Sequence, residues 1–248
     1  MAEKLRSILR RISWSSVLKA AIFAVAWWAL PFWLFLLVSL YLYFVPMTGA
    51  EKVSAPFFVL LLVTLLQKPS VVFALIFAVV FYFLLLVKDL IIIDRRSAYE
   101  VLMLVLSYLL VRGFFLNVGG SFGWWSLFYG ALVAGVVSAL VTSFVKNFPG
   151  SSAAAVAAPE DPARATRSFH RMLGWMIFLL TWQLLIVGLF LPLNFLYQSA
   201  IIFLVAVIIL DLVPQHVFGE LTRIKVLATG IVLFALLVIV LSSARWVL

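Results

Sequence analysis

The sequence contains no cysteine, and only 11% of its 248 residues are charged. Without a thiol the chain has no disulfide, no thiolate metal site and no cysteine nucleophile. A soluble domain is about half apolar and about 25% charged, whereas 67% of this chain is hydrophobic, with a mean hydropathy of +1.25. This composition cannot cover a surface that faces water. The sequence therefore predicts an all-α, polytopic transmembrane helix bundle.

Eight long apolar runs mark the predicted membrane segments. They are Ala20–Phe44, Ser54–Gln67, Ser70–Ile93, Ala98–Val118, Trp124–Val145, Met172–Leu191, Phe195–Val213 and Val226–Ala244. Seven of them approach or exceed the length of about 20 residues that a crossing helix needs. Ser54–Gln67 has 14 residues, about 21 Å of helix, and falls short of a hydrocarbon core of about 30 Å. We therefore expect seven crossings and one short re-entrant or interfacial segment.

The distribution of basic residues supports that count. If Ser54–Gln67 enters and leaves on the outer side, the inner side holds 14 basic residues and the outer side only Lys52, Lys68, Arg112 and Arg245. If all eight runs cross, which is the alternative, the split is 8 inside and 10 outside and carries no signal. The positive-inside rule favours the first arrangement. It predicts a plasma (cytoplasmic) membrane protein with its N-terminus inside and its C-terminus outside.

Residues 1–19 open with a basic amphipathic pattern. The apolar residues Leu5, Ile8, Leu9 and Ile12 recur at helical spacing. The other face holds the predicted lipid-binding cations Lys4, Arg6, Arg10 and Arg11. This pattern predicts a helix that lies on an anionic inner leaflet. A docking helix for a partner, or a targeting signal, is the alternative, and the long apolar run that follows indicates a retained signal-anchor.

A stretch rich in small residues and proline divides the chain. Residues 146–170 include Pro149, Gly150, six residues from Ala153 to Ala158, and Pro159, a composition that does not bury a core. We interpret 146–170 as a flexible inner-side linker, with a regulatory loop as the alternative. It separates an N-terminal membrane bundle, residues 20–145, from a C-terminal three-helix segment, residues 171–248.

The run Trp124–Val145 carries two rows of small residues at a spacing of four. Gly130, Ala134 and Ser138 form the first ridge, and Ala131, Gly135, Ala139 and Ser143 form the second. Small residues at this spacing let membrane helices approach closely. The pattern predicts a central helix with neighbours on two sides, or self-association through one ridge. The preceding Gly119–Gly123 is interpreted as a short outer turn.

The ionisable residues of the predicted helices lie at their ends rather than at the membrane centre. An inner-face charge cluster consists of Asp94, Arg95, Arg96 and Glu100, in which Arg96 and Glu100 are four residues apart and are expected to pair. Asp211, His216 and Glu220 are the candidate residues for a catalytic or metal-binding role. Their spacing matches no known motif, so anchoring of a helix at the headgroups is the simpler interpretation, and no metal or cofactor is predicted.

These features favour a non-enzymatic scaffold or accessory subunit of a membrane complex. The sequence contains no HExxH and no P-loop, and ionisable groups are missing from the predicted membrane centre, where transporters of charged solutes need them. A transporter or flippase for a hydrophobic or lipid-linked substrate is the first alternative, with Ser54–Ser70 lining the entry. An enzyme that acts at the inner headgroups is the second. The expected partners are an anionic bilayer and a homo-oligomer or larger membrane complex, without nucleic acid.

Overall fold

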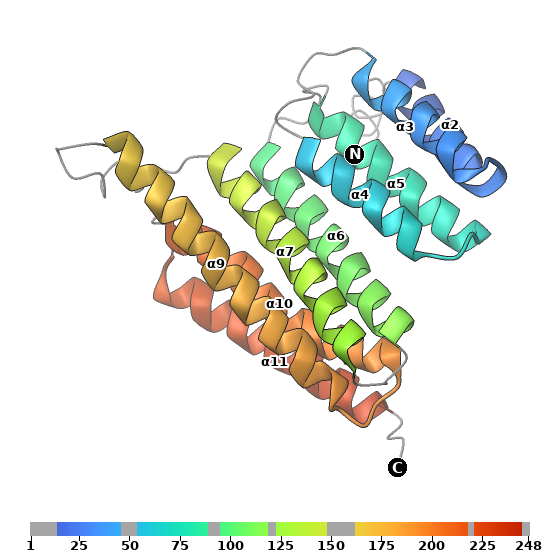
Figure 1. Cartoon of the computed structure of the whole chain (residues 1–248). Coiled ribbons are helices and arrows are strands. Elements are labelled where there is room, and N and C mark those ends of the chain that lie inside the picture. Colours follow the sequence, from blue (N-terminus) through green and yellow to red (C-terminus); the bar gives the residue numbers. More distant parts are fainter. Residues whose placement is uncertain are drawn as a thin grey trace, which may run out of the picture. The chain divides into compact units, whose positions relative to one another are not determined.

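A computed structural model describes residues 14–45, 54–88, 95–118, 123–147, 162–217 and 221–244, and the elements that these residues form are all helices (Figure 1). They are α2 (Trp14–Ala29), α3 (Phe32–Phe44), α4 (Ser54–Leu66), α5 (Val71–Lys88), α6 (Arg95–Val118), α7 (Trp124–Asn147), α9 (Pro162–Leu189), α10 (Phe195–Val217) and α11 (Arg223–Ser243). The chain forms two compact units, Met1–Leu102 and Met103–Leu248, here called unit 1 and unit 2. The predicted all-α fold is confirmed.

The apolar run Ala20–Phe44, predicted as a single crossing, is a hairpin of two helices in unit 1. Helix α2 ends at Ala29 and α3 begins at Phe32, because Pro31 has no N–H to donate and disfavours helical backbone at Leu30. The rings of Phe23 and Phe35 lie 5.2 Å apart, whereas in one continuous helix their separation of 12 positions would correspond to about 18 Å. The two helices lie side by side (Figure 1). The prediction of one continuous helix over Ala20–Phe44 was wrong.

A second hairpin, α4 and α5, packs beside the first within unit 1. Helix α4 has 13 residues, as the short run predicted, and α5 has 18. The core between the hairpins is aromatic. Phe23 of α2 stacks on Phe81 of α5 with ring centroids 4.2 Å apart, and Tyr43 of α3 stacks on Phe57 of α4 at 4.0 Å.

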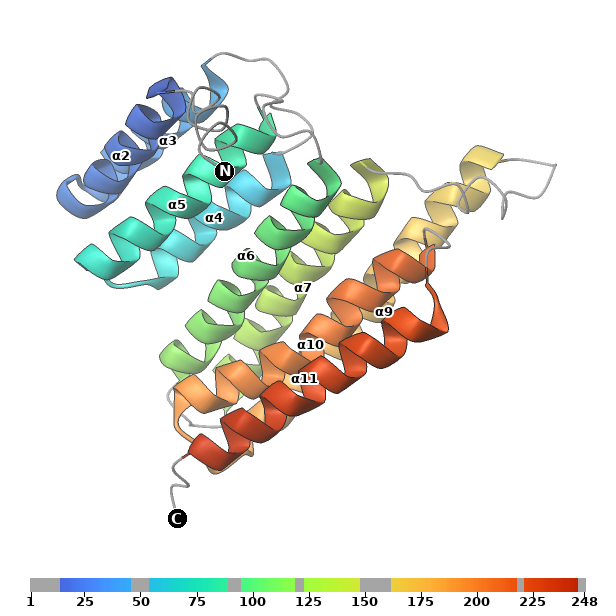
Figure 2. The same ribbon diagram turned by 180° about the vertical axis from the view of Figure 1, so that it is seen from behind.

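Unit 2 consists of longer helices. Helix α7 packs along α9, and α10 contacts α7, α9 and α11. Helix α11 lies on α10 at the edge of this unit, as the view from behind shows (Figure 2). Leu233 is the one buried residue along Arg223–Ser243. One face of α11 therefore packs on α10, and the rest of the helix is largely exposed.

Within the described residues, five helices are long and apolar enough to cross a membrane, which agrees with the predicted class of protein. Their spanning parts are Val71–Lys88, Arg96–Val118, Trp124–Asn147, Phe169–Leu189 and Arg223–Ser243. Helices α2, α3 and α4 are shorter, with 16, 13 and 13 residues. Each predicted run after the first corresponds to one helix of the structure. Most of the helix ends lie within a few residues of the ends of the run.

The compact units divide within α6, whereas the sequence suggested a division at the 146–170 linker. Helix α7 extends to Asn147 and α9 begins at Pro162, so that only residues 148–161 of the linker lie outside the described residues. The helices on either side of the linker, α7 and α9, pack against each other. They therefore belong to the same unit.

Candidate functional site

The first small-residue ridge of α7 lies against α9. Its members Gly130, Ala134 and Ser138 are buried. The hydroxyl of Ser138 donates to the backbone carbonyl of Gly174 at 2.6 Å, and the indole N–H of Trp182 donates to that of Leu127 at 3.2 Å. Side-chain hydrogen bonds between helices complement close packing where no hydrophobic effect drives association. The first ridge thus forms a tight helix–helix contact.

The second ridge of α7 makes no comparable contact within the described residues. Its members Ala131, Gly135, Ala139 and Ser143 are partly or fully exposed. A Cβ built on Gly135 would have no heavy atom within 4 Å. Among the described residues, α7 has neighbours from two helices, since a Cβ on Gly130 would lie 3.4 Å from Phe114 of α6 and 3.5 Å from Trp182 of α9. These neighbours cover the first ridge and leave the second partly exposed.

Gly188 of α9 lies where the helices of unit 2 approach very closely. A Cβ at this residue would lie 2.6 Å from Phe115 Cζ of α6 and 2.7 Å from Ile202 Cγ1 of α10. Three helices therefore meet at a point where no side chain fits. Sequence reasoning did not single out Gly188, although a lone glycine inside an apolar helix is a known sign of close packing.

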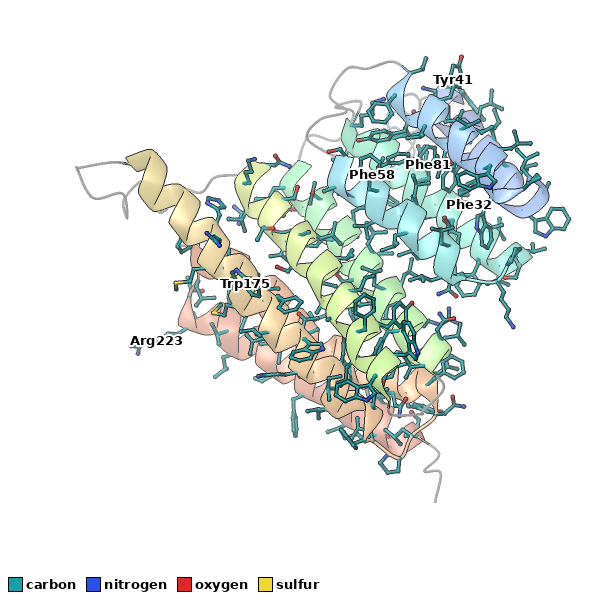
Figure 3. The ribbon with its side chains drawn as sticks, viewed as in Figure 1. Phe32, Tyr41, Phe58, Phe81, Trp175 and Arg223 are labelled. Carbon is teal, nitrogen blue, oxygen red and sulfur yellow. The ribbon has the colours of Figure 1, made fainter. Side chains whose placement is uncertain are left out.

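A groove of about 440 Å³ opens between α7 and α9. Ser138 and Thr142 line it from α7, and His170, Arg171, Gly174, Trp175 and Phe178 line it from α9. Figure 3 labels Trp175 on this part of α9. Sequence reasoning missed the groove, because its residues come from helices on either side of the linker.

The predicted inner-face charge cluster is described in part. Arg96 Nε and Glu100 Oε1 lie 3.4 Å apart, one turn apart on α6, and both side chains are about one-third exposed. Arg95 is the first residue of α6, and Asp94 lies outside the described residues. The Arg96–Glu100 pair is local to one helix.

Two of the three candidate catalytic or metal-binding positions lie on α10. The helix continues through Pro214 to Val217 and includes Asp211 and His216, while Glu220 lies outside the described residues. No group of three or more His, Asp or Glu side chains that could hold a metal ion occurs in the part of the chain that the structure describes.

Two lysines of unit 1 bind the carbonyl end of α3, which the sequence did not suggest. Lys19 Nζ donates to the backbone carbonyl of Val45 at 2.5 Å. Lys88 is 1% exposed, and its Nζ donates to the carbonyl of Tyr43 and lies 5.1 Å from the centre of the Tyr43 ring. The last carbonyls of a helix lack partners within it and attract cations. Lys19 and Lys88 therefore bring the start of α2 and the ends of α3 and α5 to the same end of unit 1.

Two other sequence features fall mainly outside the described residues. The cations Lys4, Arg6, Arg10 and Arg11 are among them. So are residues 119–122 of the outer turn Gly119–Gly123, whose spacing also matches the pattern G-x-S-x-G. In hydrolases that serine lies on a turn from a strand to a helix, whereas here the flanking elements α6 and α7 are both helices. The pattern therefore lacks its structural context.

Comparisons with protein-family models, curated proteins and solved structures found no match.

Proposed function

We propose that the chain is an integral membrane protein with nine crossings that serves as a non-enzymatic scaffold or accessory subunit of a membrane complex. The observation that carries the subunit role is the isolation of α11. This helix is apolar along its length, packs mainly on α10 among the described helices and buries one residue, Leu233. A helix held on one side presents its remaining surface to lipid or to the helix of a partner.

Glycine positions on two helices favour a partner over lipid. A Cβ on Gly135 of α7 or on Gly230 of α11 would have no heavy atom within 4 Å in the described chain. Glycine is unfavourable inside a helix, by about 1 kcal/mol relative to alanine, and membrane helices use it where another helix approaches closely. Neither glycine has such a neighbour among the described residues, and a second protein or a second copy would account for both.

The two hairpins of unit 1 support the proposed count of nine crossings. Trp27, near the turn of the first hairpin, donates its indole N–H to the backbone carbonyl of Thr64, near the turn of the second. The two turns therefore lie at similar depth. Lys68 lies in the second turn and is exposed, and a charge is too costly to leave in the hydrocarbon. Exposed tryptophans flank the first turn at Trp28 and Trp33, as is typical of the interface.

A topology of nine crossings also increases the difference in the number of basic residues between the two sides of the membrane. Only three basic residues then lie outside, namely Lys68, Arg112 and Arg245. The other fifteen of the 18 lie inside, namely Lys4, Arg6, Arg10, Arg11, Lys19, Lys52, Lys88, Arg95, Arg96, Lys146, Arg164, Arg167, Arg171, Arg223 and Lys225. This distribution supports an inside N-terminus and an outside C-terminus, with the short helices of unit 1 in locally thinned bilayer.

Single-cysteine labelling tests the topology, because the chain has no native cysteine. An impermeant thiol reagent applied to whole cells should label Leu30→Cys and Pro69→Cys at the two turns. It should not label Ser97→Cys, near the start of α6, until the cells are opened. Protection of Leu30→Cys in intact cells would leave the first hairpin inside the bilayer and reduce the count to seven.

Native mass spectrometry of the protein, extracted gently from its own membrane, tests the subunit role. We expect a stoichiometric protein partner or a defined homo-oligomer. Gly230→Leu should weaken that association, whereas Ala235→Leu, which adds a larger side chain on a different face of α11 from Gly230, should not. A lone chain in every extraction would overturn the proposal.

Transport of a hydrophobic or lipid-linked substrate is a second candidate, favoured by Gln67 at the end of α4. Its side chain is 5% exposed, and neither its amide nitrogen nor its amide oxygen has a hydrogen-bond partner. An unpaired buried amide is costly and calls for an explanation, and a polar group of a passing substrate would supply the missing partner. Substrate movement into vesicles should then fall in Gln67→Leu while thermal stability rises. Unchanged transport by this variant would remove Gln67 from the pathway.

A further inference from the structure

The groove between α7 and α9 has an apolar floor and a cationic rim. The hydroxyls of Ser138 and Thr142 donate to backbone carbonyls, that of Ser138 to Gly174 at 2.6 Å and that of Thr142 to Ser138 at 2.8 Å. Their hydrogens are therefore engaged within the protein. Gly174 leaves room at the base of the groove, since a Cβ on this residue would lie 3.2 Å from Thr142 Cγ2. Such a floor suits a hydrocarbon chain better than a polar ligand.

The rim of the groove carries only positive charge from its two helices. Arg171 is exposed and His170 is half-buried. Lys146, one turn beyond Thr142 on α7, is exposed as well. Neither α7 nor α9 contains an Asp or a Glu. The groove therefore complements an anion.

The groove lies at the depth of a lipid headgroup. The apolar part of α9 begins at Phe169, which places His170 and Arg171 at its edge. Trp175 and Phe178 follow about one and two turns further in, and the indole of Trp175 is 58% exposed. Cations at the boundary, followed by aromatic side chains toward the hydrocarbon, match the order of phosphate and acyl chain in a phospholipid.

From this arrangement we infer that the α7–α9 groove binds one anionic phospholipid. Its phosphate lies against Arg171, with Lys146 and His170 nearby, and an acyl chain runs over Gly174 along Trp175 and Phe178. A soluble phosphate compound would use the same cations but would leave the apolar floor and the exposed indole without a contact. The inference does not rest on the proposed subunit role, because all of its residues belong to α7 and α9.

Lipid retention by the purified full chain tests this inference. The protein is exchanged into mixed micelles with equal amounts of phosphatidylglycerol and phosphatidylcholine, and bound lipids are counted by native mass spectrometry. We expect one phosphatidylglycerol to be retained in preference to phosphatidylcholine. Arg171→Gln should lower its occupancy by about fivefold, the effect of one cation at an anionic membrane surface.

The matched control is Arg223→Gln, which removes an exposed arginine at the start of α11, away from the groove (Figure 3). It should leave the retained lipid unchanged. Trp175→Ala tests the acyl contact without altering charge, and should also reduce retention. Equal retention of both lipids, or equal losses in the two arginine variants, would overturn the inference. Displacement of the bound lipid by millimolar inorganic phosphate would overturn it in favour of a soluble ligand.

These outcomes are distinguishable from those of the subunit test. Loss of the bound lipid in Arg171→Gln with the protein partner still present would confirm the groove independently of the assembly. Loss of the partner in Gly230→Leu with the lipid still bound would do the reverse.

Discussion

The two units of this chain stabilise apolar helices by different means. In unit 1 the helices are short and the core is made of stacked rings, Phe23 on Phe81 and Tyr43 on Phe57. In unit 2 the helices are longer, and the closest approaches occur where side chains are small or missing, as at Ser138 against Gly174 and at Gly188. The composition of both units is apolar, so the difference comes from the positions of aromatic and small residues.

The length of the helices explains this difference. Short helices offer few turns of contact, and each contact in unit 1 therefore uses a large side chain with a wide dispersion surface. Long helices gain from backbone proximity along several turns, which requires glycine, alanine or serine at the contact. The units should therefore respond in opposite ways to changes in side-chain size. Deletions should harm unit 1 most, and additions should harm unit 2.

The largest effect is expected from deleting a ring in unit 1. Phe81→Ala removes a fully buried ring that stacks on Phe23 at 4.2 Å, and should cost about 3–5 kcal/mol. Opening of each unit can be followed separately by thiol labelling of one buried reporter, Val63→Cys in unit 1 or Val137→Cys in unit 2. Phe81→Ala should speed the labelling of the first reporter much more than that of the second.

The control for this deletion is Phe83→Ala, two residues further along α5, where the ring is 42% exposed. This variant should change neither labelling rate by more than a small factor. Equal acceleration of both reporters by Phe81→Ala would mean that the two units open as one, and would break the comparison.

The next largest effect is expected from adding one methyl group in unit 2. Gly188→Ala forces a Cβ to within 2.7 Å of Ile202 and closer still to Phe115, and overpacking of this kind costs about 1–3 kcal/mol. Thermal denaturation in detergent should show a lower midpoint, and the Val137→Cys reporter should label faster. Gly135→Ala, which adds the same methyl group where no heavy atom of the described chain lies within 4 Å, should leave the midpoint of the isolated chain unchanged or raise it.

A smaller loss is expected from the hydrogen bond between α7 and α9. Ser138→Ala removes a donor that lies 2.6 Å from the carbonyl of Gly174. Side-chain hydrogen bonds between membrane helices contribute about 0.6 kcal/mol on average. The midpoint of unfolding by SDS should shift by a corresponding small amount. Ser242→Ala, whose hydroxyl bonds within α11 to Ile239, serves as the control and should have no effect.

The sequence was sufficient for the helical class and for most helix positions, because long apolar runs can satisfy their backbone in lipid only as helices. It failed at Ala20–Phe44, where a run of 25 apolar residues has the length of one tilted crossing. Hydropathy alone does not reveal a turn that reverses the direction of the chain within an apolar run. Pro31 was the available signal, since proline breaks the backbone pattern of a helix.

Tertiary neighbours account for the other features that the sequence did not reveal. The first ridge of α7 was predicted from spacing alone, but which ridge is covered depends on α9. The α7–α9 groove and the binding of Lys88 to the carbonyl of Tyr43 each join residues that are far apart in the chain. Contacts between residues so far apart produce no periodic pattern in a single sequence, so they cannot be predicted from it. The Arg96–Glu100 pair was predictable because both residues lie on one helix.

That ion pair should give the smallest effect of all. Arg96 and Glu100 are separated by 3.4 Å and are each about one-third exposed, and exposed pairs at this helical spacing contribute about 0.3–0.5 kcal/mol. Arg96→Gln and Glu100→Gln should each lower the stability of unit 1 slightly, and the double variant should lose less than the sum of the two. A double-mutant cycle on the Val63→Cys reporter measures this coupling. A coupling as large as the loss in Phe81→Ala would mean that charge, rather than stacked rings, dominates the stability of unit 1, and the contrast between the units would then need another explanation.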